Sequence, residues 1–188
     1  TKRNKENNNR KKQMKKTVFL TGATGNMGAA GLAELLKKKD LYNIVLLARP
    51  SKLNKEKLAY LKDEESVKIV WGDLLNYDDI LKCVTGADIV LHVGGMVSPQ
   101  ADYFPKRTIK TNTEAAKNIV KAVLAQPNKD EIKVVYIGTV AQTSDRNEPI
   151  HWGRTGDPIC ISVYDHYAIS KTEAEKIIVE SGIKNWVS

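Results

Sequence analysis

The chain has 188 residues, of which 41% are hydrophobic and 28% charged, and this length and composition suit one domain with a sizeable core. Its net charge is +8, but eight of the Lys and Arg residues lie within residues 1–16 against the single acid Glu6, so the remainder is nearly neutral. No apolar run approaches the roughly 20 residues that span a bilayer. We therefore expect a cytoplasmic protein with no membrane segment and no nucleic-acid partner, with a nucleic-acid-binding basic tail as the alternative.

The basic, asparagine-rich residues 1–15 are typical of a solvated, disordered tail, which we separate from a folded domain over residues 16–188. Cys83 and Cys160 lie far apart in the sequence, and we expect both to be buried thiols in a reducing compartment. The sequence has no spaced cluster of His, Cys or acidic residues, so we expect no metal site.

Strand and helix patterns alternate along the folded part, as in a parallel α/β domain. Short apolar runs predict six strands, at residues 17–21, 43–48, 67–71, 88–93, 132–137 and 186–187. Segments of helical period predict helices at residues 26–39, 77–84, 106–125 and 163–181. The unbroken apolar second strand is typical of a sheet covered on both faces, and the order of elements predicts a doubly wound parallel sheet.

A glycine-rich turn follows the first predicted strand. Residues 21–28 read TGATGNMG, with Gly22, Gly25 and Gly28 at intervals of three between a strand and a helix. A chain that reverses here and lets a pyrophosphate approach its backbone has no room for a Cβ. The amides at the start of the helix then face the phosphates. The sequence therefore predicts a phosphate-binding turn.

The second motif is Tyr167 with Lys171 four residues later, a spacing that no other tyrosine of the chain shows. Four residues are about one helical turn, so both side chains project from the same face. A free tyrosine titrates near pH 10 and is a poor proton donor or acceptor at neutrality, whereas an adjacent ammonium stabilises the phenolate. The pair predicts an acid–base site, with a surface Tyr–Lys pair as the alternative.

The two motifs together resemble the short-chain dehydrogenase/reductase superfamily, and within it the extended group that includes the NAD-dependent epimerases and dehydratases. The resemblance runs from about residue 16 to the end of the chain and implies a Rossmann-type fold. Extended members continue well beyond a sixth strand, so we expect the C-terminal part that binds substrate to be missing here. Gly138 and Thr139 stand where the family commonly has two serines, and threonine keeps the hydroxyl.

The resemblance also implies the site residues. Tyr167 would be the general acid or base, Lys171 would hold the nicotinamide ribose, and Thr139 would hydrogen-bond the substrate oxygen. Asn112 would connect to Lys171 through a water, although an asparagine in a helix is as often exposed or bonded to backbone. The implied cofactor-binding residues, besides Tyr167 and Lys171, are Gly22, Thr24, Gly25, Asn26, Met27, Gly28, Arg49, Asp73, Leu74, Val93, Gly94 and Gly95.

The end of the second strand bears on the choice of cofactor. An acid at this position binds the ribose 2′-hydroxyl of NAD, whereas a basic residue favours the 2′-phosphate of NADP. The strand runs into Arg49, with Lys52 shortly after and no acid in reach. A guanidinium binds phosphate through two parallel hydrogen bonds. We therefore expect NADP, with NAD as the alternative.

These inferences predict an NADPH-dependent oxidoreductase that acts on a carbonyl or alcohol of a small molecule. An NAD-dependent nucleotide-sugar epimerase or dehydratase is the first alternative, and a non-catalytic dinucleotide-binding regulator the second. The Tyr167–Lys171 pair argues against the regulator, which needs no proton relay. Relatives often dimerise through the long helices that follow strands four and five, so a homodimer is also expected from the resemblance.

Overall fold

The computed structural model describes residues 15–143, 161 and 163–188, and their strands form one six-stranded sheet of order β3-β2-β1-β4-β5-β6. Every strand pairing in it is parallel. The strands are β1 (Lys16–Thr21), β2 (Tyr42–Ala48), β3 (Val67–Trp71), β4 (Ile89–His92), β5 (Lys133–Tyr136) and β6 (Trp186–Val187). The predicted doubly wound parallel sheet is confirmed, and all six predicted strands are present.

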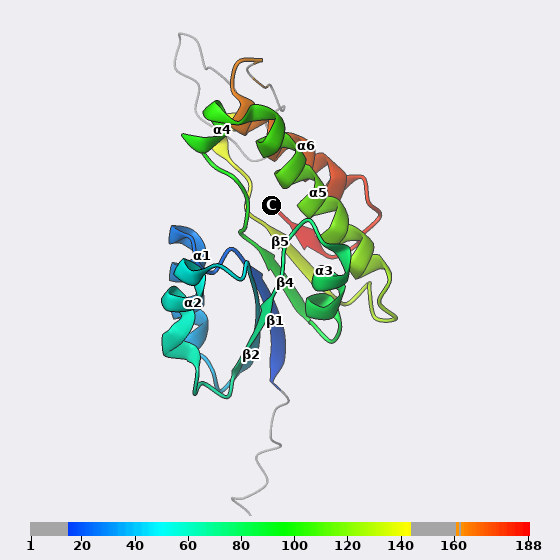
Figure 1. Ribbon diagram of the computed structural model, residues 1–188. Helices are drawn as coiled ribbons and strands as arrows, with labels where there is room; N and C mark the ends of the chain where they lie inside the picture. Colours follow the sequence, from blue (N-terminus) through cyan, green and yellow to red (C-terminus); the bar gives the residue numbers. More distant parts are fainter. Residues whose placement is uncertain (1–14, 144–160, 162) are drawn as a thin grey trace, which may run out of the picture.

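Helices connect the strands and cover both faces of the sheet. They are α1 (Asn26–Leu36), α2 (Lys52–Leu58), α3 (Tyr77–Val84), α4 (Gln100–Tyr103), α5 (Pro105–Leu124) and α6 (His166–Val179), with short 3-10 turns η1 (Ala59–Leu61) and η2 (Val140–Thr143). Figure 1 shows α1 and α2 on one side of the sheet and α3, α5 and α6 on the other. Among the described residues, no helix combines the length and the apolarity needed to cross a bilayer.

Two hydrophobic layers hold these helices to the sheet. Successive side chains of a strand point to opposite faces, so Phe19 of β1 packs in the layer under α3, α5 and α6, while Leu20 packs with Leu32 of α1 in the other. Ile119 of α5 and Ile178 of α6 belong to the first layer and are almost fully buried. Burying each such side chain contributes about 1.5–3 kcal/mol. The layers fix the strand ends that form the site.

Two helix boundaries differ from the prediction by three residues, and the other differences are of one or two residues. The last helix begins at His166 rather than at residue 163, because the carboxylate of Asp165 caps it by accepting a hydrogen bond from the amide of Ala168 at 2.8 Å. The first helix ends at Leu36 rather than at residue 39. After it, the carbonyl of Lys38 accepts hydrogen bonds from the amides of Leu41 at 2.9 Å and Tyr42 at 3.2 Å, where the chain turns into β2.

The short helices α2 and α4 were not predicted, because each is too brief to show a helical period. Cys83 is buried as expected, with its thiol in the core layer under α3. Of the predicted tail at residues 1–15, only residue 15 belongs to the described residues. Cys160 lies outside them.

Candidate functional site

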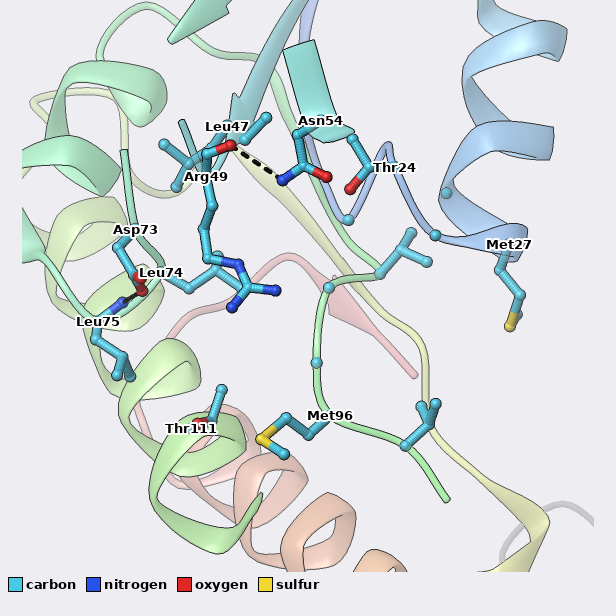
Figure 2. Close-up of a pocket in the computed structure, with 18 of the residues that line it drawn as sticks. Thr24, Met27, Leu47, Arg49, Asn54, Asp73, Leu74, Leu75, Met96 and Thr111 are labelled. Atoms are coloured by element: carbon cyan, nitrogen blue, oxygen red, sulfur yellow. Dashed lines mark hydrogen bonds between the residues drawn. The ribbon is translucent and has the colours of Figure 1, made fainter. Parts of the chain in front are cut away.

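The carboxyl ends of the strands border a cavity of about 770 Å³. It opens where the chain connections diverge, since β1 and β4 are neighbours in the sheet but lead to helices on opposite faces. Ligands of open α/β sheets bind at such a switch point. Segments that follow β1, β2, β3 and β4 all contribute to its lining, as the close-up in Figure 2 shows.

The glycine turn after β1 borders this cavity. Gly22 has φ +77°, a conformation that L side chains rarely adopt, and a Cβ there would lie 2.7 Å from the Cα and the N of Gly94. A Cβ on Gly28 would overlap the carbonyl oxygen of Gly22. The amide of Gly25 bonds that same carbonyl at 2.9 Å, which closes the turn. The absence of side chains leaves the backbone amides at the start of α1 open to an anion.

A buried hydrogen-bond cluster fixes the turn against β4. Oγ1 of Thr21 accepts the amides of Val93 at 3.1 Å and Gly94 at 2.9 Å, and it lies 2.9 Å from Nδ1 of His92. Because both oxygen lone pairs are used, the threonine hydrogen is left to donate to Nδ1, which assigns the Nε2–H tautomer to His92. Burial is the main cause that lowers the pKa of His92 to about 3, so the ring stays neutral.

Three polar side chains from the end of β2 and from α2 also line the cavity, and they are Arg49, Asn54 and Lys57. The side chain of Arg49 projects into the space that Leu74 and Met96 border (Figure 2), and its carbonyl accepts a hydrogen bond from Nδ2 of Asn54 at 3.0 Å. Nζ of Lys57 donates to the carbonyl of Thr24 at 3.0 Å, which connects α2 to the glycine turn. The guanidinium of Arg49 and the ammonium of Lys57, which is held by the carbonyl of Thr24, therefore border the same cavity.

Charge in the cavity is strongly positive. The charged side chains that line it are Arg49, Lys57, Asp73, Arg107 and Lys110. Four cations against one carboxylate favour a ligand with several negative charges. Asp73 is fixed by accepting the amide of Leu75 at 2.9 Å, while its own amide donates to the carboxylate of Asp79 at 3.1 Å. Among the described residues that line the cavity, Asp73 is the one with a negatively charged side chain.

Tyr167 and Lys171 lie on α6, and neither is among the residues that line the cavity. The ammonium of Lys171 sits 4.1 Å from the ring centroid of Tyr136, and the hydroxyl of Tyr136 donates to the carbonyl of Lys171 at 3.0 Å. Burial lowers the pKa of Lys171 to about 8, and the nearby carboxylate of Glu175 opposes that effect. Tyr136 thus locks Lys171 to the end of β5.

Asn112 is buried and makes three hydrogen bonds. Its Oδ1 accepts the amide of Met96 at 2.8 Å, and its Nδ2 donates to the carbonyl of Met96 at 3.0 Å and to Oγ of Ser170 at 2.8 Å. It therefore joins the segment after β4 to α6. Thr139 follows β5, and its Oγ1 accepts the amide of Ala141 at 3.2 Å. Among the described residues, no hydrogen bond links the side chains of Thr139, Tyr167 and Lys171 to one another.

The structure brings twelve of the predicted cofactor-binding residues to one cavity, and they are Gly22, Thr24, Gly25, Asn26, Met27, Gly28, Arg49, Asp73, Leu74, Val93, Gly94 and Gly95. It adds basic residues that the sequence reasoning missed, namely Lys57, Arg107 and Lys110. They lie on helices away from any motif, so nothing in the sequence marked them. Lys52, which the sequence had favoured beside Arg49, is exposed at the start of α2 and does not line the cavity.

Known proteins share this sequence pattern and fold. A family model described as "NAD dependent epimerase/dehydratase family" matches residues 18–185. The UDP-glucose 4-epimerase of Rickettsia bellii (strain RML369-C) is 32% identical over 128 residues, which cover 66% of this chain and 36% of that protein. The UDP-glucose 4-epimerase of Rickettsia akari (strain Hartford) is 30% identical over the same shares.

Solved structures agree on the fold. The UDP-Glc/GlcNAc 4-epimerase from Campylobacter jejuni superposes with a TM-score of 0.75 at 19% identity, over 90% of this chain and 50% of its own. The Bordetella bronchiseptica enzyme WbmH, solved in complex with NAD+, gives 0.70 at 24% identity, over 90% and 54%. The chain thus spans about a third of the length of the curated relatives and about half of the solved chains.

Proposed function

Because the chain belongs to the NAD-dependent epimerase/dehydratase family, we propose that it binds a nicotinamide dinucleotide in the cavity at the strand ends and acts as an oxidoreductase. The observation that carries the proposal is the glycine turn. Because the turn has no side chains at its glycines, the backbone amides at the start of α1 face the cavity, and the ends of four strands contribute to the lining of that cavity. In this proposal the glycine turn would hold the pyrophosphate, and Asp73 and Leu74 would border the adenosine end.

We further propose NADP as the preferred dinucleotide. The support is the charge of the cavity, whose lining includes Arg49 and three further lysine or arginine side chains against the single carboxylate of Asp73. A 2′-phosphate adds negative charge where those cations lie, and a guanidinium binds it through two hydrogen bonds. The neighbours solved with NAD+ are WbmH and the dTDP-glucose 4,6-dehydratase from Bacillus anthracis, so NAD is the outcome that the test must distinguish.

In the proposed mechanism, Tyr167 transfers a proton to or from the substrate oxygen. When bound, the nicotinamide accepts or donates a hydride at its C4. The ammonium of Lys171 would hold the nicotinamide ribose and would stabilise the phenolate of Tyr167 one turn away. Oγ1 of Thr139 donates to the same substrate oxygen as charge develops on it. Asn112 orients α6 through Ser170 and fixes the segment after β4 that borders the cavity.

Parallel fluorescence titrations with NADPH and NADH test the cofactor proposal, with Arg49→Ala as the variant and Lys52→Ala as the control. Both residues are basic and exposed in the same segment, but only Arg49 lines the cavity. Hydrogen bonds to a charged group contribute about 1.5–3 kcal/mol, so Arg49→Ala should weaken NADPH binding at least tenfold and leave NADH binding unchanged. Tighter binding of NADH by the unaltered protein would refute the preference, and binding of neither would refute the site.

The curated relatives favour a second candidate, an epimerase acting on a nucleotide sugar. Such an enzyme takes a hydride from its substrate and returns it, so it holds its dinucleotide through the cycle. Dinucleotide that stays bound through purification, with interconversion of UDP-glucose and UDP-galactose and no net change in its absorbance at 340 nm, would support this candidate. Net consumption of NADPH with a carbonyl substrate would support the reductase. Tyr167→Phe should abolish either activity while dinucleotide binding persists.

A further inference from the structure

A buried carboxylate lies on α6 one helical turn after Lys171, and the hydrogen bonds of the fold do not account for it. Glu175 is only 9% exposed, and its Oε2 has no hydrogen-bond partner. Within the part of the chain that the structure describes, Glu175 also forms no ion pair. A carboxylate oxygen that is buried without a hydrogen-bond partner is destabilised, and a positive charge nearby offsets that cost.

The geometry of α6 supplies that charge. Tyr167, Lys171 and Glu175 are spaced by four residues, so the three side chains form one stripe along the helix. Lys171 is itself only 6% exposed, and its ammonium lies against the ring face of Tyr136. No described acceptor takes a hydrogen bond from that ammonium, which leaves its protons for a ligand. A buried cation and a buried anion thus lie one turn apart without touching.

We infer that Glu175 is a positioning residue that acts through Lys171: its buried carboxylate keeps the buried ammonium protonated while leaving the ammonium's hydrogens free for the ligand. A salt bridge would hold the charge equally well but would occupy those hydrogens. The inference rests on the proposed function, since it concerns how the same site is prepared for a dinucleotide and for proton transfer by Tyr167.

The electrostatic balance around Lys171 agrees with this role. Burial lowers the pKa of Lys171 to about 8, and the carboxylate of Glu175 is the charge that opposes the decrease. Titratable groups of the neighbouring elements that act on this cluster are His92 of β4, Tyr136 of β5, and Tyr167 and Glu175 of α6. His92 is neutral and burial raises the pKa of Tyr136, so neither carries charge near neutrality. From α5 comes the amide of Asn112, which does not titrate.

The test follows the protonation of Lys171 directly in the full chain. In protein labelled with 13C-lysine, the Cε signal of Lys171, assigned by its loss in Lys171→Arg, is followed by NMR against pH. Removing an opposite charge one turn away should move the titration midpoint down by about 1 pH unit in Glu175→Gln. Glu175→Asp keeps the charge and should stay near the midpoint of the unaltered protein.

Glu173→Gln is the matched control, because Glu173 lies on the same helix but pairs with Lys176 on the exposed face at 3.0 Å. It should leave the Lys171 midpoint unchanged. A midpoint that does not move in Glu175→Gln overturns the inference, and so does a shift in Glu175→Asp as large as that in Glu175→Gln, which would show that packing rather than charge is responsible.

NADPH titrations of the same proteins separate this inference from the proposed function. Affinity should decline above the Lys171 midpoint, and the decline should begin at lower pH in Glu175→Gln. Failure of the unaltered protein to bind either dinucleotide would refute the proposed function while the NMR midpoints still report on the coupling. Binding whose pH dependence is the same in both proteins, despite shifted midpoints, would overturn the positioning role.

Discussion

Replacing Asn112 by alanine should destabilise the protein severely, because three hydrogen bonds of this one side chain join α5 to two other segments. Two of these bonds satisfy the amide and the carbonyl of Met96, and the third reaches Ser170 on α6. With each bond contributing about 1 kcal/mol, the loss is about 3 kcal/mol in the free energy of unfolding. For a chain of this size that corresponds to a decrease in Tm of roughly 6–12 °C.

Urea denaturation followed by circular dichroism measures this loss, with Asn118→Ala as the control. Asn118 lies on the same helix and makes one bond, from Nδ2 to the carbonyl of Leu74 at 3.0 Å, so its removal should cost about 1 kcal/mol. A double-mutant cycle with Ser170→Ala then isolates the bond between the two helices. If Asn112→Ala loses no more stability than Asn118→Ala, the reasoning that Asn112 joins the segments is refuted.

Three further outcomes are expected. Gly22→Ala should lower the free energy of unfolding by at least about 1–2 kcal/mol because of the positive φ, and by more because the new Cβ would contact Gly94, and it should weaken NADPH binding. Gly31→Ala is the control, because its Cβ meets nothing within 4 Å, and it should raise the free energy of unfolding by about 0.5–1 kcal/mol. Equal unfolding midpoints for the two variants would contradict the argument. Asp165→Ala removes the N-cap of α6 and should lower the free energy of unfolding by about 1 kcal/mol, and Asn76→Ala should do the same at the N-cap of α3. A Tm equal to that of the unaltered protein would show that these caps do not stabilise the fold. His92 has a pKa of about 3 in the folded protein and about 6.5 unfolded, so the unfolded chain binds the extra proton between these values and stability falls as pH falls through that window. Relative to His92→Gln, the protein should lose about 2 kcal/mol between pH 7 and pH 5, and parallel pH curves would disprove the neutral buried ring.

Local sequence patterns were sufficient to predict the sheet, its parallel sense and the position of the glycine turn. Strand and helix signals of this kind are local, since each depends on the period of apolar residues over a few positions. Gly22 and Gly28 are required because neither position has space for a Cβ, and that constraint is visible in the spacing TGATGNMG. The same local information placed Tyr167 and Lys171 on one face of a helix. The helical period did not reveal that Asp165 caps this helix, so the start of the helix was predicted three residues too early.

The charge of the cavity, the contacts of Asn112 and the environment of Lys171 depend instead on how the helices pack on the sheet. Lys57, Arg107 and Lys110 meet Arg49 only because two helices far apart in the sequence border the same strand ends. Burial determines the surroundings of the charged groups on α6. The ammonium of Lys171 lies against the ring of Tyr136, and Glu175, whose Oε2 has no hydrogen-bond partner, follows one helical turn later. Such long-range contacts depend on how the helices pack on the sheet, and the free energy of a buried charge depends on everything packed around it, which no short stretch of sequence specifies.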